Sequence, residues 1–202
     1  MPDWDSDSPE LDGNLRDVVV HARRSATRRE RPTVAMMRDW HAAIMRDLAI
    51  PDPAYVGRFR GEPGVEHIRV GVLGVEATPP GQVAAELADF ERRLRRVIVQ
   101  LDSEIPAGSD LTVDNLRAVI EVCAWAHGEW VRIHPFVNGN GRSGRLWIAY
   151  IAMRYGLPIF VRMRPRRDDD YGAAAARAMR GDWQALVPFL RRQLAATLRA
   201  AN

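Results

Sequence analysis

The chain has 202 residues, of which 47% are hydrophobic, and this is enough to bury one good-sized core. Its 29 basic and 26 acidic residues give a formal net charge of only +3, so we expect no nucleic-acid partner. The absence of lysine excludes a lysine-dependent phosphate loop and a Schiff-base mechanism. The single cysteine, Cys123, excludes an intrachain disulfide. Neither a long apolar run nor a signal peptide is present, and we therefore expect a cytoplasmic protein without a membrane span.

The first third of the chain predicts two helices behind a polar lead-in. Residues 1–14 are acidic and rich in proline and serine, which is typical of a mobile segment. A helical pattern over 15–29 ends at a break around Pro32. Thr33 is then placed to cap a second helix, which Pro51 stops.

The middle of the chain first changes in composition and then returns to a helical pattern. Between Val56 and Pro80, glycines alternate with apolar residues, which predicts a short strand pair that needs helices to pack against. A long helix follows over about 82–101, with one apolar face and a run of arginines that we expect to be solvated.

Two further helices flank the most informative segment. Apolar residues recur from Leu116 to Val131 at three- and four-residue steps until Pro135 ends the helix. The helix over about 142–155 is apolar almost all round, as expected of a central, buried helix. An alanine-rich segment and a final helix from about Trp183 complete an all-α domain.

The loop between these two helices predicts a phosphate-handling site. Residues 134–145 read HPFVNGNGRSGR and place a histidine, a glycine-rich turn and two arginines before a helix. Glycines let main-chain N–H groups approach an anion, and a helix N-terminus attracts it. Arg142 and Arg145 lie one turn apart, and the His134 imidazole can accept a proton near neutral pH. The alternative is a glycine-rich turn without chemistry.

The other histidines predict no chemistry of their own. No His-Glu-x-x-His spacing is present, so a zinc hydrolase is not indicated. His127 is expected to face the core or a helix end, and the same structural interpretation applies to His21, His41 and His67.

The loop resembles the signature of the Fic family, His-x-Phe-x-(Asp/Glu)-Gly-Asn-Gly-Arg-x-x-Arg, part of the Fic/Doc superfamily. The matching residues are His134, Phe136, Gly139, Asn140, Gly141, Arg142 and Arg145. The similarity extends over about residues 15–190. It implies a single domain over 15–195 with the Fic fold, an all-α helical bundle whose small β-hairpin flap, residues 65–78, covers the active-site loop.

This resemblance implies a protein adenylyltransferase, which moves AMP from ATP to a Tyr, Ser or Thr hydroxyl of a target protein with Mg²⁺, or Mn²⁺ in its place. His134 would be the general base. The implied nucleotide-binding residues are Gly139, Asn140, Gly141, Arg142 and Arg145. A target segment would pair with the flap at Val70, Gly71, Val72 and Leu73. Tyr171 matches a tyrosine near the nucleotide base in some relatives, with a packing role as the alternative.

One position departs from the signature. Asn138 stands where active members place an acidic magnesium ligand, and a neutral amide adds no charge attraction. The alternatives are therefore a weak or inactive module that binds nucleotide or protein, and an enzyme that transfers or removes another phosphate-linked group.

Regulation is a second implication of the resemblance. Many members carry an inhibitory helix with the motif Ser/Thr-x-x-x-Glu-Gly/Asn, whose glutamate blocks the second motif arginine. The expected helix is 15–31, and we predict that Glu30 pairs with Arg145, although only the glutamate agrees with the motif. An inhibitor protein or a second copy of the chain are the other expected regulators.

Overall fold

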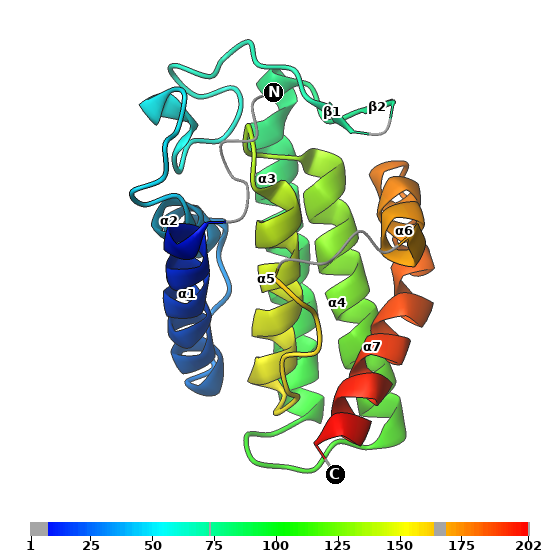
Figure 1. Ribbon diagram of the computed structural model, residues 1–202. Helices are drawn as coiled ribbons and strands as arrows, with labels where there is room; N and C mark the ends of the chain where they lie inside the picture. The colour runs from blue at the N-terminus through cyan, green and yellow to red at the C-terminus, as the bar shows by residue number, and fades with distance from the viewer. Residues whose placement is uncertain (1–7, 73, 164–168, 202) are drawn as a thin grey trace.

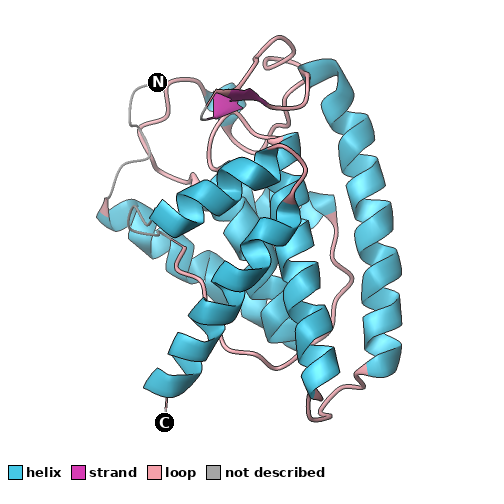
Figure 2. Ribbon diagram, turned by 90° about the vertical axis from the view of Figure 1, so that its right-hand side faces the viewer, coloured by secondary structure: helices cyan, strands magenta, loops and turns pink. Residues whose placement is uncertain are grey.

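The computed structural model describes residues 8–72, 74–163 and 169–201. Within them, seven α-helices and one two-stranded hairpin form an all-α bundle, so the predicted fold class is confirmed (Figures 1 and 2). The helices are α1 (Pro9–Thr27), α2 (Val34–Ile44), α3 (Pro80–Glu104), α4 (Val113–Ile133), α5 (Asn140–Arg154), α6 (Asp169–Met179) and α7 (Leu186–Ala200). Two 3₁₀ turns lie at Pro53–Tyr55 and Trp183–Ala185, and the strands are β1 (Gly71–Val72) and β2 (Val75–Glu76).

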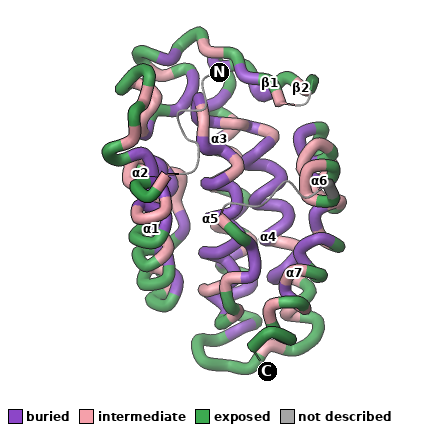
Figure 3. The backbone as a smooth tube through the Cα atoms, in the orientation of Figure 1, coloured by how far each residue is buried: buried purple, intermediate pink, exposed green. Residues whose placement is uncertain are grey.

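Helices α4 and α5 form the centre of the bundle, and the other helices pack around them. Buried positions run along both helices in Figure 3, which agrees with the all-round apolar pattern of α5. Trp130 of α4 and Trp147 of α5 meet edge to face with ring centroids 5.7 Å apart. The indole N–H of Trp130 also donates to the Ser143 hydroxyl across 2.8 Å, so the polar tip of this buried ring is satisfied.

The first helix begins earlier than expected. It starts at Pro9, inside the predicted lead-in, because the Ser8 hydroxyl accepts from the Leu11 N–H (3.1 Å) and proline suits the first helical turn. Leu11 and Leu15 are buried, so they attach the beginning of α1 to the core. Residues 1–7 of the predicted lead-in lie outside the described residues.

The remaining helix boundaries agree with the sequence patterns to within a few residues. Thr33 caps α2 as expected, since its hydroxyl accepts from the Met36 N–H across 3.0 Å. Cys123 is fully buried on α4, and burial raises the pKa of its thiol, which is consistent with an inert packing residue.

The predicted flap is present as a short antiparallel hairpin at the end of the bundle where α4 meets α5 (Figure 1). Gly71 pairs with Glu76 and Val72 with Val75. The hairpin is extended by a bond from the Ala77 N–H to the Val70 carbonyl (3.0 Å).

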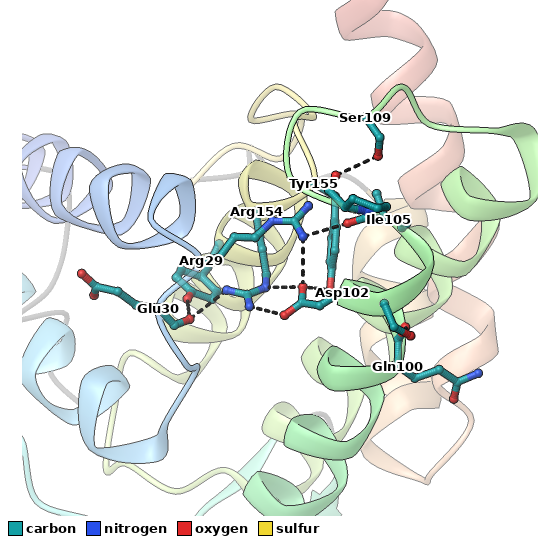
Figure 4. A network of polar contacts seen from close by, with 11 residues as sticks. Arg29, Glu30, Gln100, Asp102, Ile105, Ser109, Arg154 and Tyr155 are labelled. Carbon is teal, nitrogen blue, oxygen red and sulfur yellow. Dashed lines mark hydrogen bonds and ion pairs between the residues drawn. The ribbon is translucent and has the colours of Figure 1, made fainter.

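A polar network ties α1, α3 and α5 together near the C-terminal end of α5 (Figure 4). The buried Arg154 guanidinium donates to the Asp102 carboxylate across 2.5 and 3.1 Å and to the Glu30 carbonyl across 2.8 Å. Arg29 lies 3.6 Å from the same carboxylate, and the Tyr155 hydroxyl donates to it. The network leaves the charge of Arg154 paired, which a buried guanidinium requires.

Among the described residues, no helix is both long and apolar enough to cross a membrane.

Candidate active site

The predicted histidine stands where α4 ends. Pro135 cannot continue the helix, and His134 adopts the left-handed conformation (φ 53°, ψ 58°) while its N–H still donates to the Trp130 carbonyl. This conformation costs a non-glycine residue about 1 kcal/mol, so surrounding contacts must hold it.

The hydrogen bonds of His134 define its tautomer. Its Nδ1 lies 3.2 Å from the Val131 carbonyl, which can only accept, so Nδ1 carries the proton and Nε2 keeps a lone pair. Burial, with a smaller contribution from the nearby Arg60 charge, lowers the pKa of His134 to about 4. The ring is therefore neutral near pH 7, the state that a general base needs.

The glycine-rich turn leads directly into α5. Gly139 is the N-terminal cap and has a positive φ of 79°, which glycine adopts at low cost. The Asn140 side chain does not point to a ligand. Its amide accepts from the Phe136 N–H (2.9 Å) and donates to the Phe136 carbonyl (2.8 Å), so it closes the loop from inside. Phe136 is fully buried, as its expected packing role requires.

The predicted residues meet around one cavity of about 390 Å³. It is lined by Val70, His134, Val137, Asn138, Gly139, Asn140, Gly141, Arg142 and Arg145. The structure therefore brings together the histidine, the start of α5, both arginines and one flap residue. Gly71 and Val72 follow Val70 in the hairpin, whereas Leu73 lies outside the described residues.

Arg145 is held at the cavity by main-chain and side-chain acceptors. Its Nε and Nη2 donate to the Met163 carbonyl across 3.1 and 2.7 Å, and its Nη1 donates to the Tyr171 hydroxyl across 2.9 Å. The Tyr171 hydroxyl also lies 3.0 Å from His127 Nε2, and the Tyr171 ring packs on Phe189. His127 is fully buried, as expected, and Tyr171 joins it to Arg145.

Asn138 does not provide a magnesium ligand like the acidic residue of the signature. Its amide oxygen accepts from the Gly139 N–H across 2.5 Å, and its carbonyl lies 3.0 Å from His41 Nε2. Within the described part of the chain, no three His, Cys, Asp or Glu side chains form a metal-binding cluster. The residues present therefore do not fit a magnesium ion held by the protein.

The structure corrects the predicted position of Glu30. Its carbonyl accepts from Tyr150 and Arg154 near the C-terminal end of α5, and its carboxylate lies 3.8 Å from Arg28. Arg145 lies nine residues earlier on α5, about 13 Å along the helix axis. The expected pair of Glu30 with Arg145 is therefore not formed.

A buried arginine that sequence reasoning missed supports both the loop and the flap. Arg60 is 1% exposed, and its guanidinium donates to four carbonyl groups. The acceptors are those of His134 (2.7 Å), Thr78 (2.8 Å), Ile133 (2.9 Å) and Ile68 (3.2 Å). Two acceptors lie at the negative end of α4 and two beside the hairpin, so one cation fixes the histidine and the base of the flap together. The signal that could have identified Arg60 is its place in the Gly-Arg-Phe-Arg stretch at 57–60.

The chain is similar in sequence to known proteins. A model of the Fic/DOC family matches residues 31–152. The chain is 32% identical over 145 residues to the protein adenylyltransferase Fic of Drosophila persimilis, covering 72% of the chain and 24% of that relative. It is 39% identical over 74 residues to the Nematostella vectensis protein of the same name, covering 36% and 17%. The chain thus spans about a quarter or less of the length of these curated relatives.

Solved structures show the same fold. A Fic domain containing signaling protein from Bacteroides thetaiotaomicron superposes with a TM-score of 0.67 at 21% identity, over 95% of this chain and 72% of that one. Fic-1 from C. elegans superposes with a TM-score of 0.66 at 22% identity, over 99% and 52%.

Replacing the buried arginine tests its structural role. Arg60→Met leaves four carbonyls, two of them in buried hydrogen bonds, without this donor, so we expect a loss of about 2–4 kcal/mol in the free energy of unfolding. Amide hydrogen exchange should accelerate over residues 65–78. Arg58→Met, at an exposed position two residues away, is the matched control. Equal melting temperatures for the two variants would contradict this role.

Proposed function

The chain belongs to the Fic/DOC family, and from this premise we propose that it is a protein adenylyltransferase that moves AMP from ATP to a hydroxyl side chain of a target protein. The observation that carries the proposal is the cavity shared by His134, the N-terminal end of α5 and two arginines, with His134 Nδ1 committed to the Val131 carbonyl. Relatives that bear the name protein adenylyltransferase support the same reaction class.

The proposed reaction is a displacement at the α-phosphorus of ATP. The target hydroxyl oxygen forms the new bond to phosphorus while the bond to the bridging oxygen of the β-phosphate breaks, and pyrophosphate leaves. His134 Nε2 accepts the hydroxyl proton, because its lone pair is free and its partner Nδ1 is committed to the Val131 carbonyl.

The cations and the helix end would bind the triphosphate. Arg142 would neutralise charge on the departing phosphates, and Arg145 would hold the terminal phosphate. The contacts of Arg145 with Met163 and Tyr171 support this role, since they keep its guanidinium at the cavity. The main chain at Gly139 and Gly141 would add donors at the start of α5.

The flap would position the target. Its strands are two residues long, and an extended segment could add to the hairpin through main-chain hydrogen bonds. Val70 also lines the cavity, so a bound segment would bring its hydroxyl near His134.

The neutral Asn138 favours a slow enzyme. We propose that Mg²⁺ or Mn²⁺ is held mainly by the nucleotide phosphates, because the Asn138 amide is neutral and adds no charge attraction. The same observation favours the second candidate, a nucleotide-binding module without transfer.

We also propose a different inhibitory carboxylate. Ser8-Pro9-Glu10-Leu11-Asp12-Gly13 keeps the spacing of the inhibitory motif, with aspartate in place of glutamate. The following residue, Asn14, donates to the carbonyls of Ile44 and Arg46. These flank Met45, which packs so closely on Gly139 that an added Cβ would be 2.7 Å from its methyl group. The first turns of α1 therefore lie near the catalytic loop, unlike Glu30.

The first prediction concerns the base. His134→Ala should reduce incorporation of label from α-phosphate-labelled ATP by about 10²–10⁴-fold, while ATP binding measured by calorimetry persists. His21→Ala, an exposed histidine on α1, should label like the native protein. Undiminished labelling by His134→Ala would refute the enzyme assignment. ATP binding without transfer in the native protein would establish the binding module instead.

The second prediction concerns the metal. Asn138→Asp should raise the labelling rate about tenfold or more at subsaturating Mg²⁺, because a carboxylate adds charge attraction and an oxygen ligand. Asn138→Ala, which also removes the amide, is the control and should give no gain. A rate for Asn138→Asp equal to that of Asn138→Ala would show that this position does not limit metal use.

The third prediction separates the two candidate inhibitory residues. Asp12→Ala should increase self-labelling several-fold, and Glu30→Ala should leave it unchanged. Glu10→Ala is matched to Asp12→Ala, since both remove an acid from the first turn of α1 at a similar small cost in helix stability. Activation by Glu30→Ala alone would reverse this assignment.

A further inference from the structure

His41, which the sequence offered only as a structural histidine, lies against the catalytic loop. It belongs to α2 and is 1% exposed. Its ring stacks on Phe136 with centroids 3.7 Å apart and planes inclined by 11°. Gly139 also rests on this ring, since an added Cβ there would be 3.1 Å from His41 Nε2.

Both ring nitrogens of His41 have partners of fixed polarity. The Gly57 N–H lies 3.1 Å from Nδ1 and can only donate, so Nδ1 is an acceptor. The Asn138 carbonyl lies 3.0 Å from Nε2 and can only accept, so Nε2 carries the proton. His41 is thus held as the neutral Nε2–H tautomer, and burial lowers its pKa to about 4. His134 is held as the opposite tautomer.

The bond to Asn138 determines the orientation of the next peptide group. In a trans peptide the C=O and N–H groups point in opposite directions, and the described residues contain no cis peptide. Holding the Asn138 carbonyl toward α2 therefore turns the Gly139 N–H away from α2. The oxygen that accepts from this N–H is the Asn138 amide oxygen, 2.5 Å away, and both residues line the cavity.

We propose that His41 is a positioning residue of the nucleotide site: it fixes the Asn138–Gly139 peptide so that the Gly139 N–H is presented to a phosphate oxygen of ATP. The inference rests on the proposed function. The Asn138 amide oxygen occupies the position that the phosphate oxygen would take, so it acts as an internal substitute for the ligand. His41 acts through the loop main chain and does not contact the phosphate itself.

Two substitutions separate the contributions of the ring. His41→Phe keeps a ring that can stack on Phe136 but loses the donor to Asn138. His41→Gln loses the stacking, and its side-chain NH₂ can replace the Nε2 donor. His41→Phe also loses the acceptor for the Gly57 N–H, whereas the Gln amide oxygen can accept from it, so the Gly57 amide resonance is followed beside that of Gly139. Trp40→Phe, next to His41 but packed on Tyr150, is a control for general loss of core packing.

The experiment measures the Gly139 amide by ¹⁵N–¹H NMR, the ATP dissociation constant by calorimetry, and the melting temperature. We expect His41→Phe to shift or broaden the Gly139 amide and to weaken ATP binding about tenfold, the loss of one oriented hydrogen bond. His41→Gln should recover most of both properties, although it melts no higher than His41→Phe. Trp40→Phe should melt lower than the native protein and bind ATP normally.

Several outcomes would overturn the proposal. They are a Gly139 amide unchanged in His41→Phe, ATP affinity that follows melting temperature across the variants, or a His41 tautomer with the proton on Nδ1 in ¹⁵N spectra. The Gly139 amide and the tautomer are read without nucleotide. If the native protein bound no ATP while these two signals behaved as expected, the proposed function would fail and the positioning of the peptide by His41 would stand.

Discussion

The site depends on one internal clamp, the pair of hydrogen bonds between the Asn140 side chain and the main chain of Phe136. A glycine-rich turn has many accessible conformations, and fixing them costs entropy. The clamp closes the turn over five residues, and the buried Phe136 ring then attaches it to the core. The same bonds turn the Asn140 amide inward, so under the proposed function the nucleotide would be bound by main-chain donors and arginines. The glycines therefore leave the main chain open to close approach, and Asn140 fixes the conformation of the turn.

Residues outside the motif also hold the site in place. Arg60 holds the carbonyl of His134 from the side of the flap, and His41 holds the carbonyl of Asn138 from α2. Tyr171, at the start of α6, contacts Arg145. Each support comes from a different segment of the chain, and each fixes a different part of the loop. The cavity is therefore assembled where three separate segments of the chain meet the α4–α5 junction.

The contrast between the contacts within the loop and the supports from distant segments explains what the sequence could predict. Helices α2 to α5 carry strong periodic patterns and capping residues, so they were predictable to within a few residues. The loop residues are adjacent in the chain, and for this reason they meet at one cavity. Arg60 and His41 act on residues 74 and 97 positions away, and helical periodicity and capping patterns do not predict such contacts. Glu30 was misplaced because a single matching glutamate says nothing about which end of α5 it reaches. The start of α1 was missed because residues 1–14 are acidic and rich in proline and serine, although Leu11, Leu15 and Val18 already had helical spacing.

The electrostatics of the site follow from the same architecture. The histidines at the loop are neutral near pH 7, since burial lowers the pKa of both His41 and His134 to about 4. The positive potential of the cavity thus comes from arginines and from the start of α5, and none of the described residues that line it is acidic. A carboxylate at position 138 would attract a cation but would also reduce this potential. With asparagine there, the protein itself favours a polyanion, and under the proposed function the divalent cation would be bound with the nucleotide. His134 remains neutral mainly because it is buried, and the Arg60 charge contributes in the same direction, so under the proposed function its imidazole is ready to accept a proton.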